Sequence, residues 1–75
     1  MMWIEVFKTN ITNSQQANRL IEEIHRTFND YRVNFDLSDC DRILRVVSCT
    51  ENIQSAYFIE WLKKYGCCAE VLPDN

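Results

Sequence analysis

Hydrophobic and polar residues alternate along several short stretches of the chain, a pattern typical of strands with one buried face. Polar turn formers between the second and third stretches predict a hairpin. A further apolar stretch lies just before the single proline. Together these patterns predict four strands, at residues 4–8, 31–37, 43–49 and 67–72.

The first predicted strand carries apolar side chains on both faces. Ile4 and Val6 share one face, and Trp3, Glu5 and Phe7 share the other. We expect the aliphatic pair to face the core and the aromatic pair to face away from it.

Two longer stretches have apolar residues at helical spacing. Asn13 can cap the first helix, and residues 50–52 offer similar capping side chains before the second. Gly66 stands where helices commonly end with a left-handed residue. The predicted inner faces contain Ala17, Leu20, Ile21, Ile24 and Phe28 in the first helix, and Ser55, Phe58, Ile59, Leu62 and Tyr65 in the second.

The order strand, helix, strand, strand, helix, strand predicts an α+β protein with a ferredoxin-like βαββαβ fold. Right-handed crossovers give an antiparallel four-stranded sheet with order 4-1-3-2 and both helices on one face. In this topology Cys40, Cys67 and Cys68 share one end of the sheet, and Cys49 lies at the opposite end.

Length and composition limit the classes of function that are open to this chain. The 75 residues suit one domain, spanning residues 1–75. Residues 1–5 show neither a signal peptide nor an anchor, so we expect a cytoplasmic protein with reduced thiols and no membrane partner. The net charge of −3 and the scattered lysines and arginines argue against nucleic-acid binding. One glycine cannot form a glycine-rich phosphate loop.

A family resemblance is carried by residues 33–39 (VNFDLSD), 44–46 (LRV) and 66–72 (GCCAEVL). These segments resemble the heavy-metal-associated (HMA) domains of copper chaperones and metal-transporting ATPases. In that family a Met-x-Cys-x-x-Cys motif between the first strand and first helix holds the metal, usually Cu(I). The resemblance places those two cysteines near Asn10 and Asn13, and a neutral amide cannot replace a thiolate as a Cu(I) ligand. It therefore implies an HMA-like domain without the usual metal loop.

The cysteines outside this loop allow more than one interpretation. A relocated site for Cu(I) or Zn would use Cys67 with Cys68 or Cys40. However, adjacent strand residues point to opposite faces, and two strands separate Cys40 from the last strand, so no single-chain site follows. Alternatively, Cys67 fills core space as a small apolar residue and the others are incidental. A strained disulfide between Cys67 and Cys68 is a third arrangement.

The remaining candidate residues favour structural roles. His25 lies beside the apolar stripe of the first helix, without an identifiable catalytic partner. Asp36, Asp39 and Asp41 lack the central glycine and further acids of a calcium loop, so they are predicted to shape a turn. Because no nucleophile, base and orienting group come together, we do not expect an enzyme.

The sheet face away from the helices is a different kind of candidate site. Aromatic residues there could stack on RNA bases, but the acidic balance argues against it. Contiguous apolar area more commonly marks a protein contact, so we expect a protein partner or a homodimer through this face. The chain is therefore predicted to be a non-catalytic interaction or regulatory module without a cofactor; the alternative is soft-metal binding. The predicted interaction face comprises Trp3, Phe7, Ile43, Val47 and Leu72, interspersed with Glu5, Arg32, Arg45 and Glu70.

Overall fold

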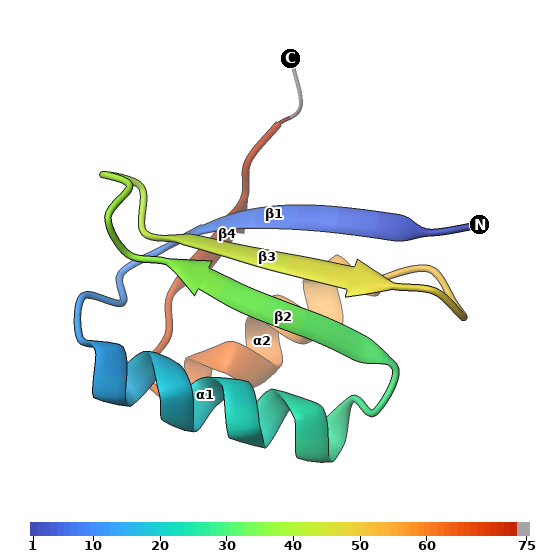
Figure 1. Cartoon of the computed structure of the whole chain (residues 1–75), viewed down its shortest axis with the longest axis horizontal. Helices are drawn as coiled ribbons and strands as arrows, with labels where there is room; N and C mark the ends of the chain where they lie inside the picture. The colour runs from blue at the N-terminus through green and yellow to red at the C-terminus, as the bar shows by residue number, and fades with distance from the viewer. Residues whose placement is uncertain (74–75) are drawn as a thin grey trace.

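The computed structural model describes residues 1–73 and alternates strands and helices in the predicted order. The elements are β1 (Trp3–Thr9), α1 (Ser14–Thr27), β2 (Tyr31–Asp36), β3 (Ile43–Ser48), α2 (Ser55–Lys63) and β4 (Ala69–Val71). The strands form one antiparallel sheet with order β2-β3-β1-β4, and both helices lie on the same side of it (Figure 1). This confirms the predicted ferredoxin-like arrangement, because 4-1-3-2 is the same order read from the other edge.

The faces of β1 are the reverse of those predicted. Phe7 pairs with Leu44, and both side chains are completely buried in the core. Trp3 points to the same side and packs against the core. Ile4 lies on the opposite, uncovered side and is 52% exposed. The predictions that Phe7 and Trp3 lie on the open face are therefore wrong.

The prediction failed because both faces of β1 carry apolar residues, so the alternation alone could not show which face is buried. Side chains alternate strictly along a strand, so a single choice places every residue of β1. Phe7 fills more of the space between sheet and helices than Val6 could, and its ring lies 5.5 Å from that of Phe58. The larger apolar side chain removes more area from water when it is buried, which favours the observed orientation.

The first helix follows its prediction closely. The side-chain oxygen of Asn13 accepts hydrogen bonds from the backbone N–H groups of Gln15 and Gln16, at 2.7 and 3.2 Å. This cap starts α1 and satisfies two of its free N–H groups. Ala17, Leu20 and Ile24 of the predicted stripe are buried.

The second helix begins later than expected. Residues 50–52 do not cap it, since α2 starts at Ser55 with Gln54 in the capping position and no side-chain cap. The chain instead buries Ile53 before the helix begins. Phe58 and Leu62 face the core as predicted, but the aromatic residue buried beside them is Trp61, whereas Tyr65 is 41% exposed.

The last strand is shorter than predicted, running only from Ala69 to Val71. Gly66 adopts the expected left-handed conformation, with φ of 78°. The following N–H of Cys67 then bonds to the carbonyl of Leu62 at 3.1 Å, which turns the chain from α2 towards the sheet. Within the described residues, no helix has the length and apolar character needed to cross a membrane.

Candidate functional site

The loop end of the sheet brings three chain segments together, as the topology predicted. The backbone N–H of Thr9 bonds to the carbonyls of Asp41 and Arg42, and its hydroxyl donates to the Arg42 carbonyl at 2.7 Å. The end of β1 is thereby bonded to the turn between β2 and β3. The side chain of Asn10 in turn contacts the segment that leads into β4.

Asn10 and Asn13, the two loop positions singled out in the sequence analysis, both have structural roles. The Asn10 side-chain oxygen accepts a hydrogen bond from the N–H of Cys68 at 2.9 Å, and its nitrogen donates to the carbonyl of Gly66 at 3.4 Å. Asn13 caps α1. These amide groups are engaged with the backbone and offer no soft ligand, so this loop does not fit Cu(I).

Cys67 lies in the core and not in a metal-binding position. Its side chain is completely buried, and this desolvation, with a smaller contribution from Cys68, raises the pKa of its thiol to about 12. Only the thiolate is an effective metal ligand or nucleophile. A thiol that stays protonated at neutral pH behaves as a small apolar residue, which was one of the two main interpretations of this position.

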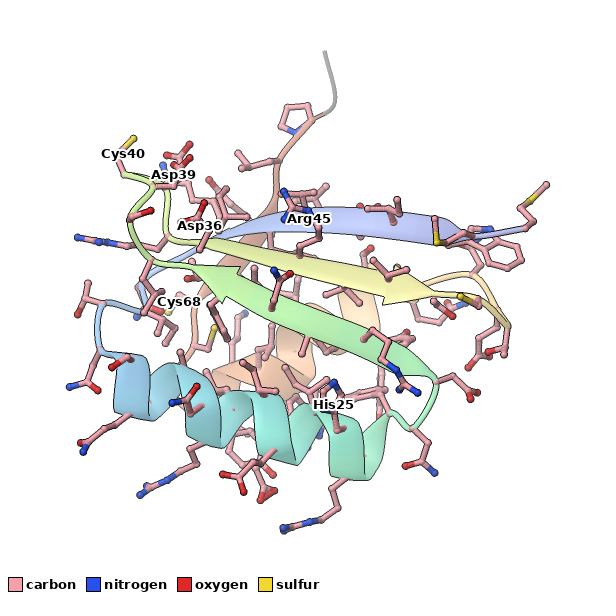
Figure 2. The ribbon with its side chains drawn as sticks, viewed as in Figure 1. His25, Asp36, Asp39, Cys40, Arg45 and Cys68 are labelled. Atoms are coloured by element: carbon pink, nitrogen blue, oxygen red, sulfur yellow. The ribbon has the colours of Figure 1, made fainter. Side chains whose placement is uncertain are left out.

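The other two cysteines of the relocated site are exposed, whereas Cys67 is buried. Cys68 is exposed, and Figure 2 shows it apart from Cys40, which lies at the tip of the turn between β2 and β3. Both β3 and β1 stand between β2 and β4 in the sheet. All four cysteines are free thiols. Within residues 1–73, Cys67 and Cys68 are in no group of three or more metal-ligating side chains.

Cys40 has acidic neighbours of its own. Ligand atoms of Asp39, Cys40 and Asp41 lie within 4.8 Å of one another, the one such cluster of three or more found among residues 1–73. The carboxylate of Asp39 accepts a hydrogen bond from the N–H of Asp41 at 2.9 Å. This bond is typical of a local turn, so turn geometry accounts for the cluster.

His25 is the remaining residue with catalytic potential. It projects from α1 beneath β2 (Figure 2), and its Nε2 atom is buried without a hydrogen-bond partner among the described residues. No carboxylate or thiol forms a cluster of three with it. The position favours a helix residue at the flank of the core over a general base.

The uncovered face of the sheet carries an aliphatic cluster on and beside β1, and Arg45 lies in the middle row of the face, directly opposite Val6. Ile4 pairs with Val47 across β1 and β3. The N–H of Leu72 bonds to the carbonyl of Val6 at 2.8 Å, so these two residues are also neighbours. Because directly paired residues share a face, the strand registers define the whole surface. We call this surface the open face: its apolar residues are Ile4, Val6, Ile43, Val47 and Leu72, of which Ile43 is only 9% exposed, and its polar residues are Lys8, Arg32, Asn34, Asp36, Arg45 and Glu70.

Three of the five predicted interaction residues therefore remain on this face: Ile43, Val47 and Leu72. Phe7 and Trp3 are replaced by Ile4 and Val6. The open face is consequently aliphatic and not aromatic, which removes the base-stacking feature of RNA-binding domains. Residues 4–6 of β1 and residues 71–73 at the end of β4 line a groove of about 580 Å³, which includes the open-face residues Ile4, Val6 and Leu72.

The size of Phe7 is the sequence feature that could have identified Ile4 and Val6 as open-face residues. Glu5 and Lys8 place one charge on each side of β1, so charge did not distinguish the faces. The role of Asn10 had no comparable signal, because its hydrogen-bond partners are 56 and 58 residues away along the chain.

No protein-family model matches the chain, and no curated protein or solved structure matches it either.

Proposed function

We propose that this protein is a non-catalytic, HMA-like interaction domain that binds a protein partner through its open face. The observation that carries the proposal is the aliphatic cluster of that face, where Ile4, Val6 and Leu72 lie together on the side of the sheet without helices. Such uncovered sheet faces are commonly polar in monomers. A contiguous cluster of apolar residues on such a face is typical of a protein contact.

The geometry also limits the kind of partner. A standard interface buries about 800 Å² on each protein, and the whole chain exposes 5010 Å². A stable complex must therefore cover a complete face of the molecule. The matching partner surface has aliphatic or aromatic side chains opposite the aliphatic cluster, and charged groups opposite Lys8, Arg45 and Glu70.

Binding through this face has a clear energetic basis. Ile4 and its neighbours are held on strands, so they lose little conformational freedom when a partner covers them. Their burial supplies the affinity, and the surrounding charges select the orientation. The cytoplasm is the proposed compartment, where the exposed thiols would remain reduced.

The test replaces Ile4 by Glu. A partner captured from cells is purified and titrated calorimetrically against the wild-type protein, the Ile4→Glu variant and a Gln15→Glu control on the exposed surface of α1. We expect binding with a negative heat-capacity change, weakened at least about tenfold by Ile4→Glu because a carboxylate would lie in the aliphatic cluster. The control should bind like the wild type. Equal binding by all three proteins would contradict the proposal.

A second experiment tests the metal alternative directly. The reduced protein, prepared without a metal-binding tag, is analysed by native mass spectrometry after addition of one equivalent of Cu(I) or Zn(II). We expect no retained metal. Retention that is lost in Cys67→Ser would replace the interaction proposal with soft-metal binding.

A further inference from the structure

The outer edge of β2 has no neighbouring strand within residues 1–73. β2 is the first strand in the sheet order, with β3 on its inner side only, and Figure 1 shows it as one margin of the sheet, above α1. It contains six residues, twice as many as β4 at the opposite margin. An exposed edge of this length presents backbone groups that can pair with another strand.

The hydrogen bonds of the sheet show which backbone groups are available. Since the carbonyl of Val6 bonds to Leu72, the backbone groups of Val6 point towards β4. These groups alternate in direction along each strand of an antiparallel sheet. Those of Phe7 therefore point towards β3, where Phe7 pairs with Leu44. The next residue of β3, Ile43, must then direct its backbone groups towards β2.

The same alternation extends to β2. Ile43 pairs with Asp36, so the backbone groups of Asp36 and Asn34 point inwards to β3. Those of Val33 and Phe35 then point outwards. The N–H of Tyr31 agrees with this assignment, because it bonds to the carbonyl of Phe28 at the end of α1. The free edge thus offers the N–H and C=O groups of Val33 and Phe35.

The residues along this edge are complementary to themselves in antiparallel orientation. We propose that β2 pairs with β2 of a second copy of this chain about a two-fold axis at Asn34. In this register Arg32 lies opposite the partner's Asp36, and Asp36 lies opposite the partner's Arg32. Val33 lies opposite the partner's Phe35 on the helix side of the sheet, and the two Asn34 side chains meet at the axis. Opposite charges and apolar pairs in facing positions stabilise such a contact.

The two charged residues are available for this pairing. Both are exposed, and the salt bridges within residues 1–73 join other side chains, Arg26 to Glu23 and Lys63 to Glu60. The guanidinium of Arg32 donates to the carbonyl of Asn29 at 3.2 Å. The carboxylate of Asp36 accepts from the hydroxyl of Ser38 at 2.7 Å. Neither side chain forms a salt bridge within residues 1–73, although Asp36 has a charged neighbour: its pKa is lowered mainly by the hydrogen bond from Ser38 and, to a smaller extent, by Arg45.

The flank of α1 beneath this edge is also suited to a second copy. Leu20 lines a groove with Tyr65, which follows α2, so this flank of α1 faces the other helix. Ile21 and His25 lie on the opposite flank, away from α2, and are half-buried. A two-fold axis perpendicular to the sheet brings the two copies of α1 side by side there. Pairing at β2 would thus cover more of this flank, where Ile21 and His25 are half-buried in the single chain.

The inferred dimer is independent of the proposed function. With the axis perpendicular to the sheet, both open faces remain uncovered and lie on the same side of one continuous eight-stranded sheet. The helices of both copies form the other layer.

Charge reversal tests the register. Sedimentation equilibrium across micromolar to millimolar concentrations should show that the wild type dimerises. Arg32→Asp and Asp36→Arg each place two like-charge pairs at the contact, so each should weaken dimerisation at least about tenfold. The double variant Arg32→Asp/Asp36→Arg restores both pairs and should dimerise like the wild type. An equal mixture of the two single variants should form a heterodimer.

Two further variants locate the contact. Val33→Pro removes an outward-pointing N–H group without removing a bond to β3, so it should give a folded monomer, with folding checked by circular dichroism. Ile4→Glu changes the open face only and should leave dimerisation unchanged. A wild-type chain that stays monomeric throughout, single variants that dimerise normally, or a dimer lost in Ile4→Glu would each overturn the inference.

Discussion

The two sides of β1 carry apolar residues alike, yet they have opposite roles in the molecule. On the helix side, Phe7 contacts Phe58 and is completely enclosed. On the other side, Ile4 pairs with Val47 and remains half exposed. The comparison shows that hydrophobicity does not by itself define the core; a side chain is buried only where another layer covers it.

The same contrast continues between the adjacent cysteines. Cys67 lies on the covered side, where burial keeps its thiol protonated. Cys68 is exposed, and its backbone N–H is bonded to Asn10. One step along the chain therefore separates an inert core residue from an accessible thiol.

Among the predicted variants, loss of the Phe7 ring should change the free energy of unfolding most. Phe7→Ala should lower the free energy of unfolding by about 3–5 kcal/mol, because it removes a fully buried ring and leaves a cavity beside Phe58. Ile4→Ala on the open face should change it by about 0.5 kcal/mol or less. Urea denaturation measures both values. Equal losses would show that the two faces contribute alike.

The second prediction concerns the reactivity of the thiols. At pH 8 a disulfide reagent should modify Cys40, Cys49 and Cys68 rapidly, because they are exposed. Cys67 should react only as the protein unfolds. Rapid modification of all four residues would contradict the burial of Cys67.

Burial of this thiol also makes stability depend on pH. The pKa of Cys67 is raised from 9.0 to about 12 in the folded chain, so the folded form keeps its proton when the unfolded form loses it. The stability that the buried Cys67 thiol contributes is therefore fully present below pH 9 and is lost progressively between pH 9 and about 12. The Cys67→Ala variant should show a shallower loss of stability over this range, and an unchanged slope would argue against the shift.

The smallest expected effect is at the loop end. Asn10→Ala removes two hydrogen bonds to the segment that positions Cys67 and Cys68. Since the side chain is exposed, the free energy of unfolding should fall by only about 1 kcal/mol. Asn52→Ala, at an exposed position in the loop between β3 and α2, is the control and should have little effect. Thermal denaturation distinguishes the two variants.

Much of the fold could be predicted because its signals are local. The apolar stripe of α1, its Asn13 cap and the alternation in β2 and β3 are each encoded within a few neighbouring residues. The start of α2 was predicted wrongly, because residues 50–52 are good capping residues and the burial of Ile53 delays the helix. That burial depends on packing against distant parts of the chain.

The candidate site was predicted in part for a similar reason. Ile43, Val47 and Leu72 lie on the predicted side of the sheet, although Ile43 is only 9% exposed. β1 offered two apolar faces, and a shift of one residue exchanges them completely. The volume between sheet and helices, which accepts Phe7, exists only after the chain has folded.

The sequence by itself determined the types and order of the elements, and with them the sheet topology, because periodicity and capping act over short distances. It also determined that the loop after β1 contains no cysteine, since residues 10–13 are read directly. Only the tertiary structure decided which side of β1 is covered, that Cys67 is inert, and that Asn10 bonds to residues near β4. Each of these depends on contacts between segments far apart in the chain, where packing and desolvation outweigh local preference.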